Sequence, residues 1–159
     1  MSPDDPNDPN ELDELYQELI MDHGRRPRNT GSADASTHQA HGYNPLCGDK
    51  LALSLRIQDG RVVDARFLGE GCAISTASAS MMTQAVKGKT VDEALALYHR
   101  FHGLVTEGET PADELEALGK LAAFAGVRRF PTRVKCASLA WHTLDAALRP
   151  EAAHTVTTE

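Results

Sequence analysis

The chain has 159 residues, of which 41% are hydrophobic, and this length and composition suit one globular domain with a sizeable core. The formal net charge is −7, but residues 1–14 hold six acids and no base, so the remainder has 17 acids against 16 bases. That balance excludes general nucleic-acid binding, and the lack of any apolar run of about 18 residues excludes a membrane span.

We expect a leader, one domain and a tail along the chain. Residues 1–10 are polar, acidic and rich in proline, and we expect them to be disordered. They do not resemble a secretory signal, so we expect a cytoplasmic protein. A single domain is expected over residues 11–149 and a flexible tail over 150–159. The first helix of the domain should be capped by Asn10 and ended by Gly24, because apolar residues recur on one helical face between these two positions.

Two strands are expected after a long connection. Residues 25–43 contain proline and glycine, and we expect a loop. Apolar residues alternate over 51–57, which predicts a half-buried strand. Asp59-Gly60 is typical of a tight hairpin turn, so the chain should return directly as a second strand over 62–68. Val63, Ala65 and Phe67 are expected on one face of that second strand.

Helices account for the rest of the domain. One is expected over residues 75–86, and a threonine and a glutamate form a capping box at 90–93 that should begin the next. A threonine followed by proline predicts the start of another helix over 110–126. The last helix should run over 131–148. Together these elements predict an α+β fold, in which a small antiparallel sheet has helices packed on one side.

The three cysteines are the strongest functional signal. Cys47 stands on a loop two residues before Asp49, Cys72 lies between a strand and a helix, and Cys136 lies in the first turns of the last helix. An odd number cannot all pair in disulfides within the chain, and thiols at helix starts are typical of reactive or metal sites. Three thiolates and one carboxylate make four ligands, which suits tetrahedral zinc. If the chain is extended from Cys47 to Asp49, both side chains point to the same side and can reach one ion.

Other interpretations of these residues stay open at this point. Each cysteine can instead be a small buried core residue. A nucleophilic pair of Cys47 with His41 is conceivable, but it leaves the other two cysteines unexplained. His99 and His102 stand three residues apart on a predicted helix, which could bind a metal, although an ordinary surface role is the simpler interpretation.

Four segments carry a resemblance to a known family. They are Cys47-Gly48-Asp49, Gly69 to Cys72, the segment from Leu15 to His23 and the run from Arg25 to Asn29. In this order they resemble the U-type iron–sulfur cluster assembly family, IscU and SufU, and the similarity extends over residues 12–148. Lys135 stands where IscU-type scaffolds have a histidine, and this departure resembles the SufU branch, as does an extra segment at about 103–127.

The resemblance to SufU implies a zinc-dependent sulfurtransferase that acts with a pyridoxal-phosphate cysteine desulfurase of the SufS type. One zinc ion per chain would be held by Cys47, Asp49, Cys72 and Cys136. A histidine of the desulfurase would displace Cys47, which would then accept persulfide sulfur and pass it to a downstream scaffold complex. Arg133 and Lys135 would supply positive charge near the sulfurs or contact the partner.

Two other functions remain as alternatives. A scaffold of the IscU type would carry an iron–sulfur cluster, although Lys135 in place of the histidine argues against a stable one. A structural zinc protein would bind the metal and do no sulfur chemistry. Nothing in the sequence indicates nucleic acid or a membrane as a partner.

Overall fold

The computed structural model describes residues 9–107, 110–149 and 155–157, so most of the expected leader and tail lies outside the described residues. Helix α1 (Pro9–Arg25) begins before Asn10 and continues one residue past Gly24, so both predicted helix ends were slightly misplaced. Gly24 allows a close approach instead, because an added Cβ would lie 3.2 Å from the Cβ of Ala73.

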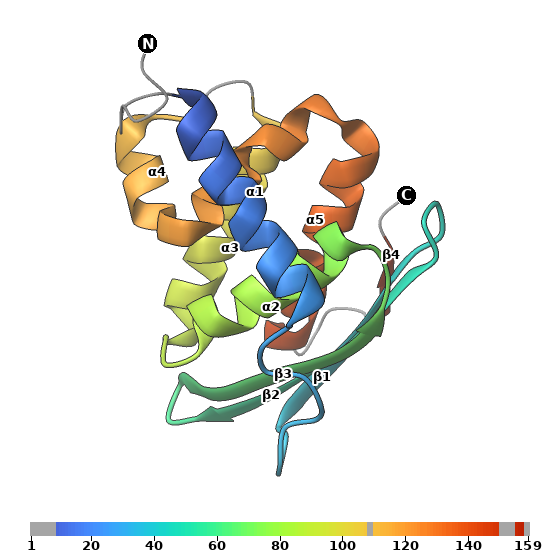
Figure 1. Ribbon diagram of the computed structural model, residues 1–159. Helices are drawn as coiled ribbons and strands as arrows, with labels where there is room; N and C mark the ends of the chain where they lie inside the picture. Colours follow the sequence, from blue (N-terminus) through green and yellow to red (C-terminus); the bar gives the residue numbers. More distant parts are fainter. Residues whose placement is uncertain (1–8, 108–109, 150–154, 158–159) are drawn as a thin grey trace.

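A four-stranded sheet forms one layer of the molecule and the helices form the other (Figure 1). The strand order is β3-β2-β1-β4, and the pairs β1–β2 and β2–β3 are antiparallel. The strands are β1 (His38–Asn44), β2 (Asp49–Gln58), β3 (Arg61–Glu70) and β4 (Thr155–Thr157). The predicted α+β fold with helices on one side of the sheet is therefore confirmed, with a short parallel strand, β4, added beside β1.

Two of these strands were not expected. The last part of the predicted loop, from His38 onward, is β1, and Thr155–Thr157 of the predicted tail is β4. The β1 segment has no β-branched residue, so its own strand propensity is low. It is a strand because every second residue, beginning with Ala40, is buried while its backbone pairs with β2.

The β2–β3 hairpin has the predicted turn, but Val63 does not share a face with Ala65 and Phe67 as predicted. Asp59 and Gly60 have φ of 54° and 76°, as a tight turn with two left-handed residues requires. The pairing register shifts between Arg56 and Ile57, which leaves Val63 as an extra residue in β3. Val63 is therefore 40% exposed, whereas Ala65 and Phe67 are buried. The buried β3 residues are Val62, Ala65 and Phe67.

The helical layer follows the predicted order with one correction. Its elements are α2 (Ala73–Val86), α3 (Val91–Thr106), α4 (Ala112–Leu118), the 3₁₀ helix η1 (Gly119–Arg129) and α5 (Pro131–Leu148). The capping box at 90–93 is present. The helix predicted over 110–126 was wrong in extent, because Gly119 adopts φ of 58° and ends α4 after Leu118.

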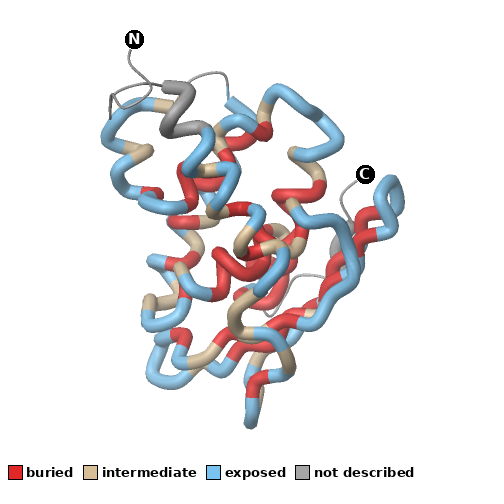
Figure 2. The backbone as a smooth tube through the Cα atoms, viewed as in Figure 1, coloured by how far each residue is buried: buried red, intermediate tan, exposed pale blue. Residues whose placement is uncertain are grey.

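The core lies where the helices cover the inner face of the sheet, as the buried segments in Figure 2 show. Helix α5 packs on β1 and β2, and α2 packs on β3. Trp141 of α5 stacks on Phe101 of α3 with ring centres 4.6 Å apart. Across the described ranges, no helix is both long and apolar enough to span a bilayer.

Candidate metal centre

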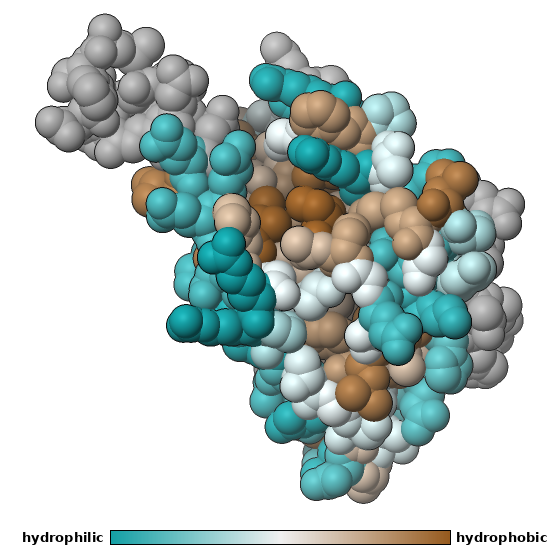
Figure 3. All heavy atoms as spheres, turned by 45° about the vertical axis from the view of Figure 1, so that its right-hand side comes forward, coloured by the Kyte–Doolittle hydropathy of each residue, from teal (hydrophilic) through white to brown (hydrophobic). Residues whose placement is uncertain are grey.

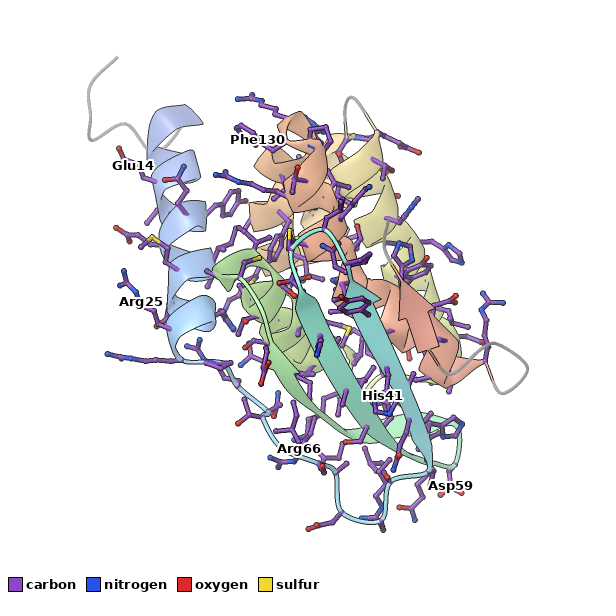
Figure 4. The ribbon with its side chains drawn as sticks, turned by 90° about the vertical axis from the view of Figure 1, so that its right-hand side faces the viewer. Glu14, Arg25, His41, Asp59, Arg66 and Phe130 are labelled. Atoms are coloured by element: carbon purple, nitrogen blue, oxygen red, sulfur yellow. The ribbon has the colours of Figure 1, made fainter. Side chains whose placement is uncertain are left out.

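The three cysteines and Asp49 meet at one end of the sheet, although they come from distant parts of the chain. Cys47 lies in the turn between β1 and β2, and Asp49 is the first residue of β2. Cys72 is the N-cap of α2, and Cys136 lies in the second turn of α5. In Figure 4 the β1–β2 turn points toward the end of α5 next to the labelled Phe130.

Three of the four predicted ligands lie within reach of one ion. The Sγ atoms of Cys47 and Cys136 are 3.4 Å apart. One ligand atom from each of Cys47, Asp49 and Cys136 lies within 4.8 Å of the other two. Among the described residues, this is the one group in which three or more possible metal ligands come so close together. The separation of the two sulfurs is far above the roughly 2.05 Å of a disulfide, and all three cysteines are free thiols.

Cys72 borders this group without belonging to it by the same measure. Its Sγ is 3.9 Å from Oδ2 of Asp49, and its backbone N–H donates to Oδ1 of that carboxylate at 2.9 Å. The Sγ atom also accepts a hydrogen bond from the backbone N–H of Ser75 at 3.4 Å, as a helix cap does. Asp49 therefore links the Cys72 region to the other two sulfurs.

Asp49 is a buried carboxylate that needs a positive partner. It is 0% exposed, and no lysine, arginine or histidine forms an ion pair with it among the side chains that the structure describes. A buried charge is costly unless a counter-charge or a metal compensates it. Gly71 leaves the space for the carboxylate, because an added Cβ would lie 2.5 Å from its Oδ1. Sulfur ligands beside this oxygen suit zinc.

Cys136 is the most buried of the three cysteines. Burial raises its pKa far above the ordinary value, and hydrogen bonding to the Cys47 and Cys72 thiols raises it further. A bound cation reverses this effect, because its charge stabilises the thiolate. Asn44, which the sequence reasoning did not identify, donates from Nδ2 to this Sγ at 3.7 Å. Its Oδ1 accepts from the backbone N–H of Leu46 at 3.2 Å, so Asn44 also shapes the turn that holds Cys47.

The other predicted residues have different surroundings. The exposed guanidinium of Arg133 stacks over the Phe130 ring at 4.6 Å, and Lys135 is half-buried in the same helix. Their predicted roles toward the sulfurs or a partner stay predictions. His41 is exposed and lines an open hollow of about 750 Å³ on the sheet, and the hydrogen bond found for the Cys47 thiol goes to Cys136. The interpretation of Cys47 and His41 as a nucleophilic pair gains no support.

Comparison with known proteins identifies relatives over most of the chain. The family model described as NifU-like N-terminal domain matches residues 15–148. The zinc-dependent sulfurtransferase SufU of Bacillus subtilis (strain 168) is 44% identical over 140 residues, covering 88% of this chain and 93% of the relative. The iron–sulfur cluster assembly scaffold protein IscU of Streptococcus pyogenes serotype M1 is 42% identical over 141 residues, covering 89% and 87%.

A solved structure gives the same relationship. The SufU protein of Fervidobacterium islandicum AW-1, described as a cluster assembly scaffold for the SUF system, superposes with a TM-score of 0.78 at 34% identity. The match covers 86% of this chain and 98% of that one. The SufU structure thus shares the fold that carries the candidate metal centre, and relatives with both names are similar in sequence over most of the chain.

Proposed function

The chain belongs to the family of NifU-like N-terminal domains, and we propose that within it this protein is a zinc-dependent sulfurtransferase. It accepts persulfide sulfur on Cys47 from a pyridoxal-phosphate cysteine desulfurase of the SufS type and passes the sulfur to a downstream scaffold complex. One observation carries the proposal. Within the three-ligand group, Cys47 is the exposed member and lies on a turn, whereas Asp49 and Cys136 are buried.

The position of Cys47 suits a ligand that leaves the cluster. It lies in the four-residue turn between Asn44 and Asp49, so it can move without displacing a strand or a helix. Cys136 is fixed in α5 and Asp49 in β2, where packing of the core restrains both. Loss of Cys47 from the cluster would therefore leave the other ligands in place.

The sulfur transfer is a thiolate exchange and needs no oxidant. The Cys47 thiolate attacks the terminal sulfur of the desulfurase persulfide, and a new S–S bond forms while the old one breaks. The desulfurase cysteine leaves as a thiolate, and Cys47 becomes a persulfide. Zinc held by Cys47, Asp49, Cys72 and Cys136 would supply the positive charge that keeps these thiols deprotonated at neutral pH.

The surroundings of Cys47 suit a protein partner. Leu46, its neighbour in the turn, is 63% exposed, and Phe130 at the start of α5 is 48% exposed. Figure 3 shows apolar side chains gathered between polar ones on one face of the molecule. Exposed apolar residues beside a cation such as Arg133 are typical of an interface. We assign desulfurase docking to this end of the molecule.

The proposal is tested by desulfurase turnover with and without this protein. Wild-type protein should accelerate sulfur release and acquire one sulfur atom on Cys47, as read by mass spectrometry of the intact chain. The Cys47→Ala variant should fold, keep part of its zinc and give no acceleration. His41→Ala, an exposed change on the same hairpin, is the matched control and should act as wild type. Normal acceleration by Cys47→Ala would refute the sulfur-acceptor role.

A scaffold function is the second candidate, because a relative named as an IscU scaffold is nearly as similar as the SufU relative. Metal analysis of protein purified without oxygen separates the two. A sulfurtransferase should be colourless and hold about one zinc per chain, whereas a scaffold should be brown and hold iron and sulfide. A structural zinc protein should show zinc without any effect on the desulfurase.

A further inference from the structure

A group of aromatic and imidazole side chains lies outside the candidate metal centre, where α3 packs against α5. Tyr98 and His102 are on α3, and His142 is on α5, six residues after Cys136. The ring centres of His102 and His142 are 5.8 Å apart with an interplanar angle of 65°. The first ring is exposed and the second half-buried, so both can be reached from solvent.

This separation is close to that of two imidazoles on one metal ion. Bonds from zinc to nitrogen of about 2.0–2.1 Å place the ion about 3.2 Å from each ring centre, so two rings at a tetrahedral angle have centres about 5.2 Å apart. The ring centres of His102 and His142 are 5.8 Å apart, within about 0.6 Å of this separation, and the exposed His102 ring is free to rotate.

Tyr98 orients the half-buried ring. Its hydroxyl lies 2.8 Å from Nδ1 of His142. When that Nδ1–H donates to the hydroxyl, the lone pair is on Nε2, which is left for a ligand; a fixed second nitrogen of this kind is usual for metal-binding histidines. Burial lowers the pKa of His142, and the nearby His102 lowers it further while Asp145 opposes the shift. This shift favours the neutral ring, which is the form that binds metal.

We propose that His102 and His142 form a second metal site, in which a late first-row divalent ion such as Ni²⁺ or Zn²⁺ joins α3 to α5 and Tyr98 positions the ring of His142. Imidazole nitrogen is a preferred ligand for these ions, and water completes the coordination. Asp145, one turn further along α5, accepts a hydrogen bond from Nε of Arg149 at 2.6 Å and is not counted as a ligand. Two protein ligands make a weaker site than the cysteine cluster.

The experiment titrates Ni²⁺ into full-length protein that carries one equivalent of zinc, so that the tighter cysteine cluster is occupied and the histidine pair is left open. Zinc content is measured before and after, to exclude exchange. We expect one equivalent of Ni²⁺ to bind by calorimetry and to broaden the imidazole NMR signals of His102 and His142. His102→Ala should weaken this binding by at least about tenfold, and Tyr98→Phe, which removes the positioning hydroxyl, also by about tenfold.

His99→Ala is the matched control, because His99 is an exposed histidine on the same helix and its ring contacts Tyr98 rather than His142. It should bind Ni²⁺ as wild type does. Ni²⁺ should also raise the thermal unfolding midpoint of wild type and His99→Ala but not of His102→Ala, since a ligand stabilises the state that binds it. The proposal is overturned if no Ni²⁺ binds at millimolar concentration, or if His99→Ala and His102→Ala behave alike.

Discussion

Asp49 is the side chain in the candidate metal centre whose position depends most on its neighbours. Its carboxylate is fully buried, and one oxygen accepts from the backbone N–H of Cys72 at 2.9 Å. Gly71 provides the space in which that carboxylate lies. A residue with a side chain at position 71 would therefore displace the Asp49 carboxylate, although all four candidate ligand residues would remain in the sequence.

We predict that Gly71→Ala weakens zinc binding by about tenfold or more, which is the scale of changes that misplace a ligand. The added Cβ would lie 2.5 Å from Oδ1 and 3.0 Å from Cγ of Asp49, so the carboxylate must move. Competition with a zinc chelator of known affinity measures the effect. Gly126→Ala is the control, because its added Cβ meets nothing within 4 Å. Equal zinc affinity in both variants would show that Asp49 is not a ligand.

The residue types at the site could be predicted from the sequence, but their geometry could not. Three thiols and one carboxylate pointed to a shared ion because one site accounts for all four residues, whereas the alternative needs three unrelated core cysteines. The extended path from Cys47 to Asp49, which the sequence argument used as a condition, is not present, since Gly48 has φ of 73° within a turn. Asn44 was missed because it is 92 residues from Cys136 in the sequence. Its side-chain amide can donate to the Cys136 thiol only once the fold has placed β1 beside α5.

At the scale of elements, β1 shows how tertiary packing overrides local propensity. Its sequence has little strand character, whereas the alternating apolar residues of β2 and the turn at 59–60 predict the β2–β3 hairpin directly. β1 is a strand because it pairs with β2 and lies under α5. Gly42 makes this approach possible, because an added Cβ would meet the side chains of Thr143 and Leu139.

Gly42→Ala should lower the free energy of unfolding by about 1–3 kcal/mol, the usual cost of an added methyl group in a close-packed interior. Denaturant unfolding followed by circular dichroism gives the value. The nearest atom to the new Cβ is Oγ1 of Thr143, so the same change should cost less in a Thr143→Ala background. An identical cost in both backgrounds would show that β1 does not press on α5 at this point.

At the scale of the whole molecule, the candidate metal centre brings together three parts of the chain that packing and hydrogen bonds also hold near one another. These are the β1–β2 turn, the junction of β3 with α2, and the start of α5. The β2–β3 turn at Asp59 lies at the opposite end of the sheet from the β1–β2 turn, as Figure 4 shows. A bound ion thus acts as a local cross-link at one end of the sheet, and its effects should be local too.

Removal of zinc by a chelator should therefore raise amide hydrogen exchange at three separate segments together, residues 44–49, 71–75 and 133–138, while the turn at 59–60 keeps its rate. Structural zinc contributes about 10 kcal/mol or more in small metal-dependent domains, but here the hydrophobic core persists, so the loss should appear as local opening rather than unfolding. Cys136→Ala, which lacks one ligand from the start, should respond little to the chelator. If hydrogen exchange instead rises evenly through the core, the metal supports the whole fold. In that case Cys47 cannot leave the metal without disturbing the other elements, and its assignment as the departing ligand is wrong.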